Sequence, residues 1–146
     1  SAHFMHLNLA HALGNVVGAW VLMFIYGSVI NVERLIWVWG CASLGISFGL
    51  WFLYPEVQWY VGASGVLHAL WAAGALWMWR DDRVFAVVSM LALMIKCWWE
   101  WHSGLSVGQW YLQGAPIVTA AHRLGVLMGL GYAALTTIPH RFFKPS

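Results

Sequence analysis

Five long apolar stretches, separated by short polar turns, constrain this chain more than any other feature. They run from 9 to 26, 35 to 53, 64 to 79, 84 to 101 and 116 to 138. A helix needs roughly 20 apolar residues to cross the hydrocarbon of a bilayer. The stretches lack the two-residue alternation of a membrane β-barrel, which leaves helices as the way to satisfy the backbone in lipid. The sequence therefore predicts an all-α membrane protein, a bundle of five transmembrane helices.

The composition and the placement of charge agree with a membrane protein. Only 8% of the residues are charged and 62% are hydrophobic, a balance outside the range of ordinary soluble domains. Once the helices alternate in direction, one side of the membrane collects the cations Arg34, Arg80, Arg83, Arg141 and Lys144. Because cytoplasmic loops carry the excess of Lys and Arg, this side is predicted to be cytoplasmic. The net charge of +2 reflects this asymmetry and does not indicate a nucleic-acid partner.

Polar and ionisable residues inside the stretches are few, and nearly all fall in the half predicted to face outward. Such a group costs a few kcal/mol in lipid unless it is paired, so each is a candidate functional residue. They are His6, His11 and Asn15 at the first stretch, Ser64 and His68 on the third, Lys96 and Glu100 on the fourth, and His122 and Arg123 on the fifth. Their common depth predicts a site near the outer surface.

Ser64 opens the third stretch, which is too short for a full crossing, at about 24 Å of helix. Charged residues at 80–83 fix its cytoplasmic end, so Ser64 is expected several ångströms below the outer surface. Gly62 and Gly65 permit a sharp turn and a close approach of backbone. The start of a helix also presents N–H groups and a positive dipole end to a developing oxyanion. We expect Ser64 to be a nucleophile.

A serine hydroxyl needs a base to remove its proton, and His122 is the best candidate. It lies one to two turns into the fifth stretch from the outer side, at the depth inferred for Ser64. Gly125 and Gly129 follow on the same helical face, and small residues allow membrane helices to pack closely. The third stretch offers Gly65 and alanines opposite them, which would bring the two side chains into contact.

Donors for a tetrahedral intermediate are predicted on the first stretch. His11 and Asn15 stand four residues apart and so project from one face of a helix, with His6 a turn and a half above. Hydrogen-bond donors placed in this way stabilise an oxyanion by about 3 kcal/mol each.

Three motifs in this chain resemble those of rhomboid intramembrane serine proteases. "HFMHLNLAHALGN", "GASG" and "AHRLGVLMG" are similar to the family's second-, fourth- and sixth-helix signatures, in the same order. The resemblance implies Ser64 as nucleophile, His122 as base, and His11 and Asn15 in the oxyanion hole, with His6 ordering the top of its helix. It also implies one catalytic domain over 1–146, truncated so that a first helix lies upstream.

A narrower resemblance is to the rhombosortase subgroup of bacteria. It rests on "GASGVLHAL" and "KCWWEW", with His68 where rhomboids commonly place a tyrosine that stacks on the catalytic histidine. It implies a transmembrane substrate with a C-terminal Gly-Gly motif, a helix and a basic tail, processed in the bacterial inner membrane at a site facing the periplasm. Neither resemblance implies a metal or a cofactor.

Several alternatives stay open at this point. Lys96 and Glu100 stand four residues apart, so they could neutralise each other, contact the substrate at the lateral gate, or supply Glu100 as a third catalytic member. His68 could orient His122, act as a second base or hold a water. Rival functions are a general rhomboid protease, a pseudoprotease that binds helices without cutting, a haem-binding protein with histidine ligands, and a transporter using Lys96 and Glu100.

Overall fold

The computed structural model describes residues 2–106 and 117–137. Within these ranges the chain forms a short 3-10 turn, five α-helices and no strand. The helices are α1 (Leu9–Tyr26), α2 (Val32–Leu53), α3 (Ser64–Met78), α4 (Arg83–Ser103) and α5 (Thr119–Thr137). Each coincides with one predicted stretch to within three residues, and the largest differences are at α2, which begins three residues early, and α5, which begins three residues late. The predicted all-α bundle is confirmed.

Among the described helices, α1, α2 and α4 are long and apolar enough to cross a membrane. The central helix α3 is apolar but has only 15 residues. Other helices surround α3, and most of its residues are buried. The polar residues of α5 keep it outside this group of three, and its buried face packs on α3. The two helices that carry Ser64 and His122 thus have the most buried residues, and α1, α2 and α4 pack against α3 around them.

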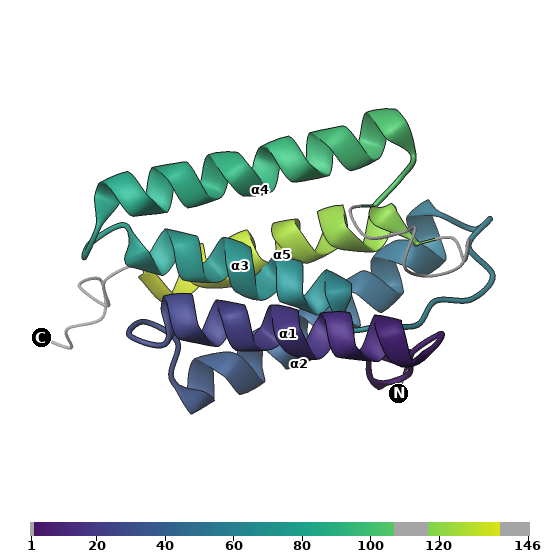
Figure 1. The fold of residues 1–146 in the computed structure, drawn as a ribbon, viewed down its shortest axis with the longest axis horizontal. Helices are drawn as coiled ribbons and strands as arrows, with labels where there is room; N and C mark the ends of the chain where they lie inside the picture. Colours follow the sequence, from purple (N-terminus) through teal and green to yellow (C-terminus); the bar gives the residue numbers. More distant parts are fainter. Residues whose placement is uncertain (1, 107–116, 138–146) are drawn as a thin grey trace, which may run out of the picture.

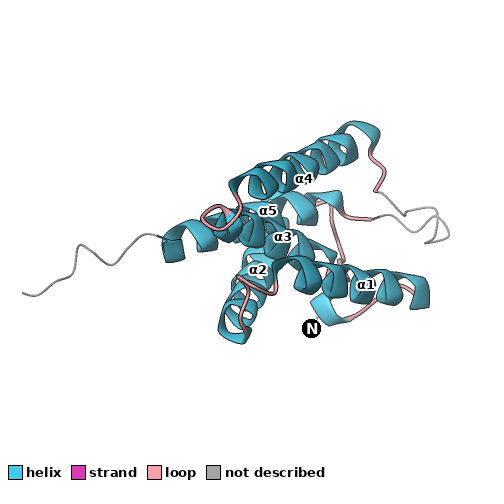
Figure 2. Cartoon of the chain, turned by 60° about the vertical axis from the view of Figure 1, so that its left-hand side comes forward, coloured by secondary structure: helices cyan, strands magenta, loops and turns pink. Residues whose placement is uncertain are grey.

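Figure 1 shows α3 and α5 running side by side, with α4 and α1 on opposite sides of α3. The view in Figure 2 keeps this order and shows α2 beside α3. The most extensive helix contact joins α3 to α5, followed by that of α2 with α5 and then by those of α2 and α4 with α3. The loops 27–31 and 79–82 lie at one end of the bundle, while α1 and α3 both start at the other end.

Small residues set the distance between α3 and α5, as the sequence predicts. A Cβ at Gly125 would overlap the backbone carbonyl oxygen of Gly65, and a Cβ at Gly129 would overlap that of Ala69. A Cβ at Gly65 would come within 2.9 Å of the Ala121 oxygen. Backbone therefore packs directly on backbone at this crossing, one residue from Ser64.

Polar residues begin the outer helices. The side chains of Asn8, Asn31 and Asp82 each accept a hydrogen bond from a backbone N–H in the first turn of α1, α2 and α4. These caps satisfy N–H groups that have no partner inside a helix. Arg34 and Arg83 lie at the bundle end away from Ser64. The predicted sidedness depends also on Arg141 and Lys144, which lie outside the described residues.

Candidate active site

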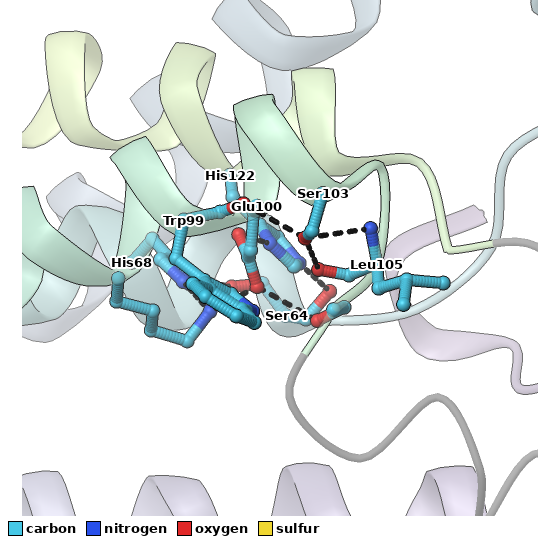
Figure 3. Close-up of polar contacts among 9 residues, drawn as sticks. Ser64, His68, Trp99, Glu100, Ser103, Leu105 and His122 are labelled. Carbon is cyan, nitrogen blue, oxygen red and sulfur yellow. Dashed lines mark hydrogen bonds and ion pairs between the residues drawn. The ribbon is translucent and has the colours of Figure 1, made fainter.

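Ser64 and His122 meet at the crossing of α3 and α5 (Figure 3). The Ser64 Oγ lies 3.0 Å from the His122 Nε2, although the residues are 58 positions apart in sequence. Ser64 is the first residue of α3, and His122 lies in the first turn of α5 with only 2% of its surface exposed. The contact expected from sequence is therefore present, and the geometry suits transfer of the hydroxyl proton to the imidazole.

The second nitrogen of the His122 ring contacts Glu100 of α4. The His122 Nδ1 lies 2.7 Å from the Glu100 Oε2, and Glu100 is 1% exposed. An ionised carboxylate can only accept a hydrogen bond, so the Nδ1–H donates to it. In a neutral imidazole this leaves the Nε2 without a proton, able to accept from the Ser64 hydroxyl.

The other oxygen of Glu100 is also occupied. The Lys96 Nζ lies 2.5 Å from the Glu100 Oε1, one helical turn earlier on α4. The Ser106 Oγ donates to the same oxygen at 2.7 Å. Glu100 therefore has a partner of opposite charge as well as two hydrogen bonds from neutral side chains, which compensates the cost of burying a carboxylate.

His68 stands where the family resemblance expects a tyrosine. Its ring stacks on the His122 ring with centroids 4.0 Å apart and planes 8° apart. The His68 Nδ1 donates to the backbone carbonyl of Ser64 at 2.6 Å, and the Lys96 ammonium donates to the His68 Nε2 at 2.9 Å. His68 is thus fixed by contacts on three sides and limits rotation of the His122 ring.

His11 and Asn15 approach Ser64 from α1. Both are buried and line a cavity with Ser64 and His122. The Asn15 Nδ2 has no hydrogen-bond partner within the described part of the chain. The His11 Nδ1 accepts from the backbone N–H of Leu7, so a neutral His11 carries its proton on the Nε2. Two donors thus flank the same space, as an oxyanion hole requires.

Gly62 and Tyr60 shape the backbone just before Ser64. Gly62 has φ +120°, where a side chain would be strained, and a Cβ there would come within 2.8 Å of the His11 Nε2. The Tyr60 hydroxyl donates to the Gly62 carbonyl at 2.8 Å. Burial raises the pKa of Tyr60, which keeps this hydroxyl protonated. Tyr60 was not predicted from the sequence, where its only signal is its position four residues before the serine.

Histidines also support the top of α1. The His6 ring packs edge-on against His11 with centroids 5.2 Å apart, consistent with the supporting position expected for His6. His3, which was not predicted as a site residue, makes a hydrogen bond of 3.0 Å with the Ser43 carbonyl of α2. The segment before α1 is therefore tied to a neighbouring helix.

Two cavities reach Ser64. The larger, about 600 Å³, is bounded by α1, α3 and Lys96 of α4, and most of its lining is apolar. The smaller, about 300 Å³, lies under residues 56–61 and shares His11 and Ser64 with the larger one. The larger volume falls within the usual range of ligand sites. Ser64 can thus be approached from the side of the bundle and from the loop above it.

Lys96 and Glu100 form the ion pair that their spacing predicts, but the two side chains lie in different surroundings. Lys96 lines the larger cavity, while Glu100 is buried behind His122. A substrate contact thus fits the position of Lys96 but not that of Glu100.

Three side chains lie close enough together to be considered as metal ligands. The ligand atoms of His68, Cys97 and Glu100 lie within 4.8 Å of one another, but the Lys96 ammonium already bonds to His68 and Glu100. Arg123 lies over the Trp101 ring at 5.5 Å.

The described residues place every predicted site residue on its expected helix or on the turn before it. The protein is thus a helical membrane protein in which the Ser64 hydroxyl contacts the His122 imidazole at one end of the core. Such a pair is equipped for acyl transfer.

Comparison with known families gives the class its name. The Rhomboid domain family matches residues 1–138, and the chain belongs to this family of intramembrane serine proteases. No curated protein and no solved structure matched the chain.

Proposed function

We propose that this protein is an intramembrane serine endopeptidase that uses Ser64 and His122 to cut a transmembrane segment near its outer end. The observation that carries the proposal is the 3.0 Å contact between the Ser64 Oγ and the His122 Nε2, both of which face one cavity. The family match is an independent support, since rhomboids are intramembrane serine proteases.

The reaction begins when the Ser64 Oγ attacks the scissile carbonyl carbon and its proton passes to the His122 Nε2. The tetrahedral intermediate then collapses, and the His122 proton goes to the leaving amine. An acyl ester on Ser64 remains. Water deprotonated by His122, or an amine, attacks this ester and releases the acyl product with the serine hydroxyl restored.

His11 and Asn15 are proposed to stabilise the negative oxygen of the intermediate. The Asn15 Nδ2 is a buried amide donor without a partner among the described residues, which is costly unless something accepts from it. An oxyanion above Ser64 would supply that acceptor. The first N–H groups of α3 add the positive end of a helix to the same space.

The proposed substrate is a single membrane helix that approaches through the larger, mainly apolar cavity and unwinds near small residues. A pair of glycines suits this step because glycine favours the helical state by about 1 kcal/mol less than alanine. Together with the "GASGVLHAL" motif, this supports a rhombosortase that acts on C-terminal Gly-Gly tails in a bacterial inner membrane, with the site facing the periplasm.

The central test uses a serine-directed fluorophosphonate on purified protein in detergent. Wild type and the matched variant Ser28→Ala, an exposed serine at the opposite end of the bundle, are expected to label equally. Ser64→Ala and His122→Ala are expected to show no labelling. Undiminished labelling of Ser64→Ala would assign the nucleophile to another residue.

A second test concerns the substrate. A membrane-anchored reporter with a Gly-Gly tail should be cleaved, and the same reporter with Leu-Leu in place of Gly-Gly should be cleaved far more slowly. Equal cleavage would favour a general rhomboid protease over a rhombosortase. The mass of the acyl product, with or without an added amine, tells which nucleophile completes the reaction. Absorption of the purified protein near the Soret band would instead support the haem-binding alternative.

A further inference from the structure

We propose that Glu100 is a positioning residue that turns the Ser64–His122 pair into a triad, and that Lys96 keeps its carboxylate ionised. This inference rests on the proposed function and assigns a role that the serine–histidine dyad of the family does not contain. Its basis is the 2.7 Å contact between the Glu100 Oε2 and the His122 Nδ1, made entirely within the core.

The contact decides which nitrogen of His122 carries the proton. With Glu100 ionised, a neutral His122 must hold its hydrogen on the Nδ1 and present the lone pair of the Nε2 to Ser64. Without the carboxylate, the Nε2–H form becomes competitive, and in that form the ring cannot accept the serine proton. A carboxylate in this position also stabilises the imidazolium that forms during attack.

Hydrogen bonds around the site close into a ring with one consistent protonation pattern. The Ser64 hydroxyl donates to His122, His122 donates to Glu100, and Lys96 donates to Glu100 and to the Nε2 of His68. His68 in turn donates to the carbonyl of Ser64. Every donor in the ring meets an acceptor when both histidines are neutral with no proton on the Nε2, Lys96 is charged and Glu100 is ionised.

A purely structural reading of Glu100 would make it only the counter-charge of Lys96. The pair is not symmetric, however, because the Glu100 side chain is 1% exposed and that of Lys96 is 22% exposed. Lys96 reaches the cavity, whereas Glu100 lies behind the imidazole with one oxygen given to Lys96 and the other to His122. Pairing with Lys96 alone would not require the second contact.

Nitrogen-15 NMR of the wild-type protein, labelled at histidine, tests the inference without any change to the site. The signal lost on His122→Ala identifies His122. In the resting enzyme at neutral pH this signal should show a protonated Nδ1 and an unprotonated Nε2. A resting His122 with its proton on the Nε2 would overturn the proposal.

Variants test the role in catalysis. Glu100→Gln should lower the rate of fluorophosphonate labelling about 10³- to 10⁴-fold, while the matched exposed variant Glu33→Gln stays at the wild-type rate. Because Glu100→Gln leaves Lys96 without its counter-charge, it is also expected to lower the unfolding temperature.

The double variant K96M/E100Q separates the two roles because it removes both charges at once. It should regain the unfolding temperature lost by Glu100→Gln while labelling remains slow. Recovery of labelling to within a few fold of wild type would mean that Glu100 serves only to balance Lys96. Labelling of Glu100→Gln at the wild-type rate would also overturn the inference. If Ser64→Ala labels as well as wild type, the proposed function itself fails, which is a different result.

Discussion

A methyl group added at Gly125 should separate Ser64 from His122 without touching either residue. The Cβ of Gly125→Ala would overlap the carbonyl oxygen of Gly65, which is backbone and cannot rotate away. The helices must part by about 1 Å before the new carbon clears this oxygen. Gly125 lies one turn after His122, and Gly65 follows Ser64 directly, so the displacement falls on the site.

The expected loss of rate follows from the lengthening of the contact between Ser64 and His122. The Ser64 Oγ and His122 Nε2 are 3.0 Å apart, so an added separation of about 1 Å takes them out of hydrogen-bond range. A misplacement of about this size costs on the order of 10²-fold in rate. Overpacking of a tight core costs typically 1–3 kcal/mol of stability.

The assay is the rate of fluorophosphonate labelling, with the unfolding temperature in the same detergent measured alongside. The control is Gly131→Ala, which makes the same change on the same helix where a Cβ meets nothing within 4 Å. It should leave labelling unchanged and the unfolding temperature equal or higher, because alanine favours helix. If Gly125→Ala labels at the wild-type rate and unfolds at the wild-type temperature, the idea that this helix crossing sets the site geometry is refuted.

Three further predictions concern two side chains of the site and one at the other end of α1. Asn15→Ala should lower kcat for peptide cleavage about 10²- to 10³-fold with KM nearly unchanged, and an unchanged kcat would remove Asn15 from the oxyanion hole. His68→Phe, which keeps the ring stacked on His122, should label about 2- to 10-fold faster than His68→Ala, as expected for an aromatic pair; equal rates would show that stacking contributes nothing. Tyr26→Phe removes a buried hydroxyl that is hydrogen-bonded to Ser89. It should cost about 0.5–2 kcal/mol of stability and leave the labelling rate unchanged. Slower labelling would contradict a purely structural role for Tyr26.

The fold could be predicted largely because the membrane leaves few solutions. Long apolar stretches must be helical in lipid, so the helix positions followed from the sequence to within a few residues. The close packing of α3 on α5 could also be predicted, from Gly125 and Gly129, because small residues repeated on one helical face indicate a close helix contact. The 3-10 turn that includes His3 escaped notice because its tie to α2 joins segments 40 residues apart.

Candidate residues were predictable where their signal was local. Ser64 opens a short helix, and His11 and Asn15 share a face through their spacing alone. Tyr60 was missed because its hydrogen bond to Gly62 depends on the path of a loop that has no periodic pattern.

The sequence by itself determined that the chain is a bundle of apolar helices and which side chains are polar at one depth within it. Only the tertiary structure decided that Glu100 meets His122 as well as Lys96. Spacing of four residues predicts the Lys96 contact because both side chains lie on one helix. The His122 contact depends on how α4 is rotated about its axis and set against α5, and that follows from packing of the whole bundle.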